Sequence, residues 1–488
     1  MNGYRNQGDR VIGDRPEQAA VVDPGGTLSY AAFEAAVQAR AAEIHERIRP
    51  GQSVGILAPN SAAWLVAFFA VQRAGGVPVP VSHKLPADAV AYVLDDAGID
   101  LLYADAVGRA LVSGTGVSVV DLDVPAPPRA FASVVPDPED VAMILYTSGS
   151  TGRPKGVRLS QRSHLWVIDQ TARRVEPGSV RVLVSAPLYH MNALTNAQRA
   201  LASGATIVLL PGFAPEPFVA AVAEHRVTEL SGVPPMFAML VQRRDLLVDA
   251  DVSSVRNIYM GSAPAAPALF DQLRELFAGA EIAFGYGTTE SGPVVFTAHP
   301  GGVPTPDGSV GVAHPAVELR LVDDAGRPTP ARGVLEVRTP ALMSGYHRRP
   351  DVAVPVTADG FHHTKDVFRV DADGFYFFEG REDDMFTSGG ENVYPRAVEQ
   401  VLEQHPAVDQ AVVVPVPDEV KGAKPVAFVT LRPGADASEA ELKAHVLARL
   451  EPFAHPRRVW VVPQIPLSGT NKADRAALTA RASALGFS

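Results

Sequence analysis

A tract rich in glycine and hydroxyl side chains between residues 146 and 156, YTSGSTGRPKG, has the composition of a phosphate-binding loop. Glycines allow backbone N–H groups to turn toward an anion, and serine, threonine and lysine side chains add further donors. The tract does not match the P-loop pattern G-x-x-x-x-G-K-[ST], because Lys155 follows Pro154 and precedes Gly156. It contains no G-x-S-x-G nucleophile elbow either. Considered alone, the tract is equally compatible with a flexible surface loop.

Four further motifs follow the tract along the chain: PLYH (187–190), GYGTTESGP (285–293), HTKD with GRED (363–366 and 380–383), and PLSGTNKADR (466–475). In this order, the five motifs resemble those of the adenylate-forming superfamily, which includes acyl- and aryl-CoA synthetases, nonribosomal adenylation domains and luciferases. The resemblance extends from the LSYAAFEAAV stretch (28–37) to the C-terminus. It implies an enzyme in which a carboxylate attacks the α-phosphorus of ATP, pyrophosphate leaves, and the acyl-adenylate then reacts with a thiol. Such a reaction depends mainly on positioning and charge neutralisation.

The resemblance assigns the phosphates of ATP to three of these motifs. The glycine-rich tract would close over the β- and γ-phosphates, with Lys155 as a nearby charge. Thr289 would bond the α-phosphate, and Glu290 would hold Mg²⁺, a hard cation that takes few carboxylates. Lys472 would bond both the acid's carboxylate and the α-phosphate, and so stabilise the developing charge. The tract residues in this role are Thr147, Ser148, Gly149, Ser150, Thr151 and Gly152.

The nucleoside would be held by the remaining motif residues. By resemblance, Tyr286, between Gly285 and Gly287, stacks on adenine. Asp366 would bind both ribose hydroxyls, and Arg381 would contact ribose and phosphate. A single carboxylate or tyrosine of this kind is more often a solvated or a core residue, so the interpretation depends on all the positions occurring together in order.

The acceptor thiol would enter after the C-terminal part of the chain has moved. In the superfamily, the residue matching Asp383 is a hinge. We therefore expect a body over 1–380, a hinge at 381–383 and a mobile C-terminal domain over 384–488 that carries Lys472. The swing would bring SGGEN (388–392) to a pantetheine tunnel; a simple tight turn is the alternative interpretation. The residues expected to contact coenzyme A are Ser388, Gly389, Gly390, Phe453 and Arg457.

SGGENVYP resembles acyl- and aryl-CoA ligases, which favours free coenzyme A as the acceptor. Three positions depart from the family pattern: Lys365 replaces a usual glycine, Ala397 a common glutamate, and Ala454 with His455 a pair that usually includes a lysine or arginine. The last change removes positive charge near the expected nucleotide of coenzyme A. A carrier protein or a non-thiol nucleophile therefore stays open as the acceptor.

The acid pocket resembles that of 4-coumarate:CoA-ligase-like and benzoate:CoA-ligase-like enzymes. Gly261 and Gly285 would leave a deep, flat slot, and His190 would lie beside the acid's carboxylate, with a structural histidine as the alternative. No acidic side chain occurs at the expected pocket positions, which disfavours an amino-acid substrate. We expect an aromatic or arylalkenoic acid first and a medium-chain aliphatic acid second. The expected pocket residues are His190, Met191, Gly261, Ser262, Ala263, Gly285, Pro293 and Val294.

The elements that must position these residues are predicted by hydrophobic patterning. Short β-rich runs at 52–58, 76–82, 180–187 and 205–210 alternate with Ala-rich amphipathic stretches such as 30–48 and 215–226, which indicates doubly wound α/β layers. The run 141–147 predicts a strand leading into the glycine-rich tract, at the carboxyl end of a strand where α/β sheets place ligands. From about residue 309, alternating strands and tight turns predict an antiparallel, β-barrel-like region. A small α+β domain follows residue 380.

Composition limits the remaining possibilities. The 488 residues exceed the usual size of one core; 47% are apolar, 20% are charged, and the net charge of -11 includes no basic block, so a nucleic-acid partner is not expected. Cysteine is absent, which excludes disulfides and thiolate catalysis. The first residues lack a signal-peptide pattern, and the longest apolar run, 62–71, is about half a bilayer span. We expect a cytoplasmic monomer or homodimer that acts on a small carboxylic acid, ATP and coenzyme A, with Mg²⁺.

Overall fold

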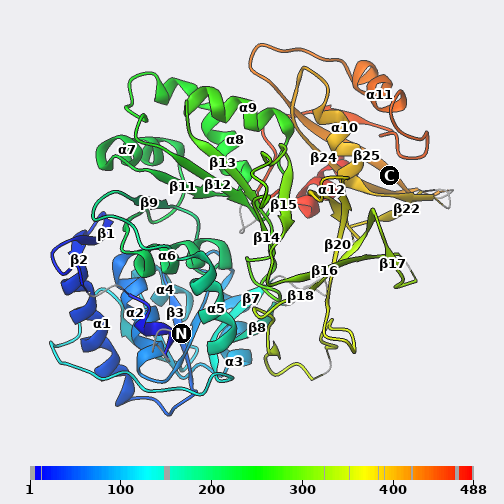
Figure 1. The fold of residues 1–488 in the computed structure, drawn as a ribbon. Helices are drawn as coiled ribbons and strands as arrows, with labels where there is room; N and C mark the ends of the chain where they lie inside the picture. Colours follow the sequence, from blue (N-terminus) through cyan, green and yellow to red (C-terminus); the bar gives the residue numbers. More distant parts are fainter. Residues whose placement is uncertain are drawn as a thin grey trace.

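The computed structural model describes residues 6–11, 14–147, 154–323, 325–350, 352–382, 384–388, 391–418, 421–467 and 472–485. Figure 1 shows a large body, coloured blue to yellow-green, and a smaller C-terminal domain, coloured yellow to red, beside it. Both parts mix helices with sheets, which confirms the predicted α/β class with a small α+β domain at the C-terminus.

Two mainly parallel sheets form most of the body. All neighbouring strands in them are parallel except the β1–β2 pair. The first sheet has the order β13 (Glu281–Gly285), β12 (Asn257–Gly261), β11 (Glu229–Gly232), β9 (Arg181–Val184), β10 (Thr206–Leu209), β1 (Ala19–Asp23) and β2 (Gly26–Ser29). The second has the order β4 (Val77–Pro80), β3 (Ser53–Leu57), β5 (Leu101–Ala104) and β6 (Ser118–Asp121).

Helices cover both faces of both sheets, as the alternating pattern predicts. One apolar core joins the two sheets to the helices α1 (Tyr30–His45), α2 (Ala62–Arg73) and α6 (Met191–Ser203). A second core joins the outer face of the first sheet to α7 (Pro215–His225), α8 (Pro234–Gln242) and α9 (Pro267–Leu276). A third joins the second sheet to α3 (Ala87–Ala97) and α4 (Ala106–Leu111). Short 3₁₀ turns occur at Gln7–Asp9 and Arg244–Leu247.

Local sequence sets the ends of the helices. The Ser29 side chain accepts a hydrogen bond from Ala32 N at the start of α1, and Ser61 accepts one from Trp64 N at the start of α2. α6 ends where Gly204 takes a left-handed conformation, with φ of 78°. These caps set where α1 and α2 begin and where α6 ends.

The glycine-rich tract lies between two antiparallel strands. β7 (Val141–Thr147) pairs with β8 (Lys155–Ser160), and β19 (Gly345–Tyr346) pairs with the other side of β8. The strand predicted over 141–147 is confirmed, and the tract follows its carboxyl end as expected, but this strand belongs to a small antiparallel sheet outside the two mainly parallel ones. A connection of six residues is too short for the crossover that parallel strands require, in agreement with the antiparallel pairing of β7 with β8. α5 (Gln161–Thr171) then follows β8.

The region predicted to be antiparallel is confirmed as a single seven-stranded sheet. Among the described residues its hydrogen-bonded order is linear, with β14 and β17 at the edges, so the barrel-like region is an open sheet. The order is β14 (Phe296–Thr297), β15 (Ser309–Ala313), β21 (Tyr376–Arg381), β20 (His362–Val370), β18 (Arg332–Arg338), β16 (Glu318–Val322) and β17 (Pro328–Thr329).

The C-terminal domain has its own sheet and its own apolar cores. Its sheet has the order β23, β22, β25 and β24, with β26 beside β25. The domain contacts the body through Arg396 Nη2, which donates to Ala265 O at 3.2 Å, and through Gln242 Nε2, which donates to Asp409 Oδ2 at 3.4 Å. Its elements are β22 (Phe386–Ser388), β23 (Glu391–Val393), α10 (Pro395–Glu403), β24 (Val408–Asp418), β25 (Gly422–Leu431), α11 (Glu439–Leu447), β26 (Val459–Val461) and α12 (Arg475–Ala484).

A search of the described residues for membrane-spanning helices finds none of sufficient length and apolar character.

Candidate active site

A cavity of about 1900 Å³ lies where the body and the C-terminal domain meet. Side chains from all of the sequence motifs reach it, although the motifs are far apart along the chain. The predicted site residues that line it are Thr147, His190, Met191, Gly261, Ser262, Ala263, Gly285, Tyr286, Gly287, Thr289, Glu290, Pro293, Asp366, Arg381 and Lys472.

Several predicted residues lie elsewhere. Val294 is buried against Val167 and Ala341, so the structure does not place it on the cavity wall. Ser388, Phe453 and Arg457 belong to the C-terminal domain and do not line the cavity in this arrangement. The predicted positions Ser148, Gly149, Ser150, Thr151, Gly152, Asp383, Gly389 and Gly390 lie outside the described residues.

Asp366 organises the end of the cavity to which the ribose was assigned. It lies on β20 opposite Arg381 of β21, and Arg381 Nη1 donates to Asp366 Oδ1 at 3.0 Å. The Tyr286 hydroxyl donates to Asp366 Oδ2. Burial, and then the charge of Asp366, raises the pKa of the Tyr286 phenol well above its usual value, so this group stays a proton donor. The Tyr286 ring meets Phe368 edge to face, with the ring centroids 4.9 Å apart.

Glu290 forms a second polar centre of the cavity. The Tyr346 hydroxyl donates to Glu290 Oε1 at 3.2 Å, and Lys155 Nζ lies 5.6 Å from the centroid of the Tyr346 ring. Burial, and then the charge of Glu290, raises the pKa of Tyr346. No group of three or more potential metal-ligating His, Cys, Asp or Glu side chains occurs in the part of the chain that the structure describes. The donor set fits Mg²⁺ held by one carboxylate, with phosphates and water completing its shell.

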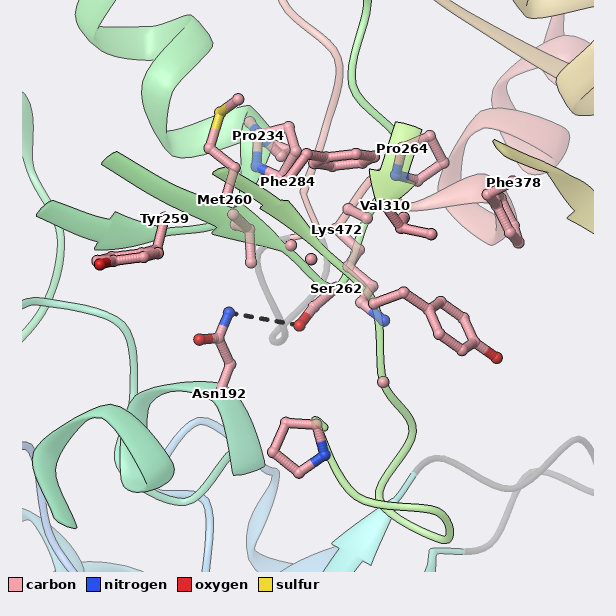
Figure 2. Close-up of a pocket in the computed structure, with 18 of the residues that line it drawn as sticks. Asn192, Pro234, Tyr259, Met260, Ser262, Pro264, Phe284, Val310, Phe378 and Lys472 are labelled. Carbon is pink, nitrogen blue, oxygen red and sulfur yellow. Dashed lines mark hydrogen bonds between the residues drawn. The ribbon is translucent and has the colours of Figure 1, made fainter. Parts of the chain in front are cut away.

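Lys472 extends from the C-terminal domain into the cavity (Figure 2). Enclosure by the surrounding protein lowers the pKa of its ammonium group, while the neighbouring charge of Asp366 opposes that shift. The lysine is thus placed to act on groups bound between the two domains.

His190 precedes α6 and faces the same cavity. Burial, together with the charges of Lys472 and Lys84, lowers its pKa to about 4, so the imidazole is neutral near neutral pH. Its buried Nε2 atom has no hydrogen-bond partner among the described residues. A buried ring nitrogen without a partner is unusual and suits a ligand atom, which favours the binding interpretation over a structural histidine.

The wall assigned to the acid lies between α6 and the strands β12 and β13. A Cβ added to Gly261 would lie 2.7 Å from Gly285 O, so this glycine permits the close approach of the two strands. A Cβ added to Gly285 would contact only Met260 O, at 3.8 Å, and would otherwise extend into open space. Gly285 therefore shapes the slot, whereas Gly261 serves the packing of its walls.

The structure adds polar wall residues that the motifs did not indicate. They are Asn192, Asn196 and Arg199 of α6 and Tyr259 of β12. Asn192 Nδ2 donates to Ser262 Oγ at 3.4 Å, and this contact joins α6 to the end of β12 across the cavity (Figure 2). The spacing of the three α6 residues by four and three positions could have indicated a shared face.

The family model described as "AMP-binding enzyme" matches residues 9–347, and the model of the C-terminal domain of AMP-binding enzymes matches residues 397–472. The chain belongs to the AMP-binding enzyme family. This AMP-binding enzyme is 34% identical to a feruloyl-CoA synthase of an Amycolatopsis species, over 96% of this chain and 98% of the relative.

Solved structures of related enzymes share the whole fold. ATP-bound MatB from Rhodopseudomonas palustris superposes with a TM-score of 0.88 at 27% identity, covering 99% of this AMP-binding enzyme and all of MatB. The amide bond synthetase McbA from Marinactinospora thermotolerans superposes with a TM-score of 0.84 at 30% identity, covering 97% and 99% of the two chains.

Proposed function

We propose that this AMP-binding enzyme is an AMP-forming acid–CoA ligase. It joins a carboxylic acid to the AMP portion of ATP, releases pyrophosphate, and then transfers the acyl group to coenzyme A with release of AMP. The observation that carries the proposal is the convergence of Lys472, Asp366 and Glu290 in one cavity. Each is the type of group that one part of the first half-reaction requires: a cation for the reacting atoms, a carboxylate for ribose, and a carboxylate for a hard metal ion.

The chain's own residues position the reactants. Asp366 and Arg381 hold the ribose, and Tyr286 fixes the orientation of the Asp366 carboxylate through its hydroxyl. The Lys472 ammonium neutralises charge as the acid's carboxylate oxygen bonds to the α-phosphorus and the bond to pyrophosphate breaks. Thr289 donates to the α-phosphate. Glu290 would hold Mg²⁺, which would supply charge neutralisation for the phosphates.

The second half-reaction requires movement of the C-terminal domain. Ser388, Phe453 and Arg457, the described residues proposed to contact coenzyme A, do not line the cavity in which Lys472 lies. A rotation at residues 381–383, with Asp383 as the hinge, would withdraw Lys472 and bring these residues toward the acyl-adenylate. Such a movement would have to break the hydrogen bonds between the domains at Ala265 and Asp409.

The acid is proposed to be aromatic or arylalkenoic. Gly285 leaves space on the slot wall beside the reaction centre, where a flat ring can lie. The 34% identity to a feruloyl-CoA synthase supports the same class, since ferulate is an arylalkenoic acid. A cytoplasmic location is part of this proposal.

The small amount of available positive charge near the proposed coenzyme A residues favours a second candidate function. In this alternative the acyl group is transferred to a carrier protein or an amine. Burial, together with Arg457 and Lys443, lowers the pKa of His455 to about 4, so it supplies no positive charge near neutral pH. Arg457 Nη1 contacts His455 Nδ1 at 2.8 Å and Arg457 Nη2 donates to Pro452 O at 3.2 Å, so this cation already has protein partners. The likeness to an amide bond synthetase supports the same alternative.

Pyrophosphate release with a panel of benzoates, cinnamates and fatty acids, measured with and without coenzyme A, tests the proposal. A CoA ligase forms thioester and AMP in equal amounts only when coenzyme A is present. Adenylate formation without thioester, across the panel, would favour the second candidate. No pyrophosphate release with any acid would contradict both.

A further inference from the structure

The acid slot has a polar face on α6. Between residues 191 and 200 this helix buries most of its side chains in the core, but Asn192, Asn196 and Arg199 stay partly accessible. Their spacing places them on one face of the helix, and all three line the cavity. A polar stripe on the wall of the slot favours a ligand with matching polar groups.

Opposite this face, β12 and β13 present successive rows of side chains that lead away from the reaction centre. The alternate residues of both strands pack into the core behind the sheet. Neighbouring rows are two strand residues apart, or about 6.6 Å. Starting next to Tyr286, the rows are Gly261 with Gly285, Tyr259 with Ala283, and Asn257 with Glu281.

An aromatic ring stands at the second row, and an ion pair stands beside it and the third row. The Arg199 guanidinium lies 5.5 Å from the centroid of the Tyr259 ring, and Arg199 Nη2 donates to Glu229 Oε2 at 2.6 Å. An alkyl tail longer than one row would have to pass this aromatic ring and contact an ion pair. Placing hydrocarbon against an ion pair removes water from the charges without replacing its hydrogen bonds.

Asn196 offers a hydrogen-bond acceptor on α6, between Asn192, which contacts Ser262, and Arg199, which contacts Tyr259. Its Nδ2 donates to Asn192 Oδ1 at 2.9 Å and to Asn192 O at 3.0 Å, which uses both amide hydrogens. Asn196 Oδ1 has no donor among the residues that the structure describes. An acceptor fixed by its own amide suits a hydroxyl group on the substrate.

We propose, on the basis of the proposed adenylation reaction, that Asn196, Tyr259 and Arg199 determine the acid specificity of this enzyme. The acid is short and flat, its ring lies on the glycine row, and a hydroxyl at its distal end donates to Asn196 Oδ1. The Tyr259–Arg199 pair closes the slot to long alkyl tails.

Matched acids test the hydroxyl contact in the full-length enzyme. Pyrophosphate release is measured with 4-hydroxycinnamate against cinnamate and with 4-hydroxybenzoate against benzoate. The hydroxylated acid of at least one pair should have a kcat/KM about fivefold higher, the usual effect of one hydrogen bond. Asn196→Ala should abolish that preference by slowing only the hydroxylated acid.

Tyr259 gives an independent test of the closed end. Tyr259→Ala should raise kcat/KM for decanoate about tenfold, while Tyr259→Phe, which keeps the ring, should not. Equal rates within both acid pairs for the wild type, or an Asn196→Ala variant that slows both members of a pair alike, would overturn the proposal while leaving adenylation intact. Absence of pyrophosphate release with every acid would overturn the adenylation proposal itself. Because pyrophosphate release reports only the first half-reaction, these outcomes do not depend on the acceptor.

Discussion

Tyr286 donates its hydroxyl hydrogen to Asp366, a residue 80 positions later in the chain. The contact joins the residue assigned to adenine directly to the residue assigned to ribose. With Arg381 on the other carboxylate oxygen, Asp366 is held from two sides before any nucleotide binds. The nucleoside site is therefore preorganised by the protein's own hydrogen bonds.

Removing only this hydroxyl should weaken ATP binding. In Tyr286→Phe the ring stays in place, but the Asp366 carboxylate loses one of its orienting donors. We expect the KM for ATP to rise about fivefold, the effect of one hydrogen bond, with kcat nearly unchanged. Initial rates of pyrophosphate release at varied ATP concentration measure both constants. A KM that stays the same or falls would show that the hydroxyl does not orient Asp366.

Glu290 should control the dependence on Mg²⁺. Changing a group that only supports a metal ligand typically costs 10- to 100-fold in metal affinity, so loss of the ligand itself should cost at least about tenfold. We expect Glu290→Gln to raise the Mg²⁺ concentration for half-maximal activity by that factor. Tyr346→Phe, which removes the 3.2 Å hydrogen bond to Glu290 and keeps the carboxylate, is the matched control and should have a smaller effect. An unchanged Mg²⁺ requirement in Glu290→Gln would place the metal elsewhere.

Lys472 should be needed for adenylation and not for thioester formation. Loss of its charge at the reacting atoms should slow adenylation about 100- to 1000-fold in Lys472→Ala. Transfer from an acyl-adenylate supplied ready-made should continue. Lys421, an exposed lysine of the same domain, gives the control variant Lys421→Ala. Equal loss of both half-reactions in Lys472→Ala would indicate damage to the fold.

The same lysine predicts a pH dependence. Enclosure lowers the pKa of Lys472 below that of a free lysine, and only its protonated form carries the useful charge. The adenylation rate should therefore fall as pH rises through this lowered pKa. Arginine stays protonated, so Lys472→Arg should keep a lower rate but lose the alkaline decline. A decline at the same pH in the arginine variant would assign it to another group.

The convergence of the motif residues could be predicted from the sequence more fully than the arrangement of the elements around them. Residues that bind a common ligand must converge in any member of a family, so the meeting of Asp366 with Tyr286 could be expected from motifs alone. The positions of Asn196 and Tyr259 on the slot wall depend on which face of α6 points toward the sheet. No sequence motif carries that information. Val294 was predicted on the wall together with Pro293, but its side chain packs with Val167 and Ala341 in the core.

The two slot glycines should respond differently to alanine. Gly285→Ala adds a methyl group to open space, so the fold should be retained while the KM for a ring-bearing acid rises about tenfold. In Gly261→Ala the added carbon would lie 2.7 Å from Gly285 O, so the strands must shift, at about 1–3 kcal/mol. Thermal unfolding and acid titrations on both variants separate the two effects. A large loss of stability in Gly285→Ala would contradict its placement on the slot.

Lys365 has a left-handed backbone, with φ of 65°, at the position where the family usually has glycine. A side chain with Cβ is disfavoured in this conformation by about 1–2 kcal/mol, whereas glycine adopts it freely. Glycine also gives the unfolded chain more conformational freedom, which lowers the free energy of unfolding by about 0.5–1 kcal/mol. Lys365→Gly should therefore have a free energy of unfolding about 0.5–1 kcal/mol higher than that of Lys365→Ala, or a thermal midpoint about 1–2 °C higher for a chain of this size.

Lys365→Ala separates the backbone from the side chain in this experiment. Alanine keeps Cβ and loses the same lysine contacts as glycine, so the difference between the two variants measures the backbone conformation alone. We expect the glycine variant to have the higher thermal midpoint of the two by differential scanning calorimetry. A glycine variant no more stable than the alanine variant would show that the strand carrying Asp366 relaxes the left-handed conformation once the lysine is removed.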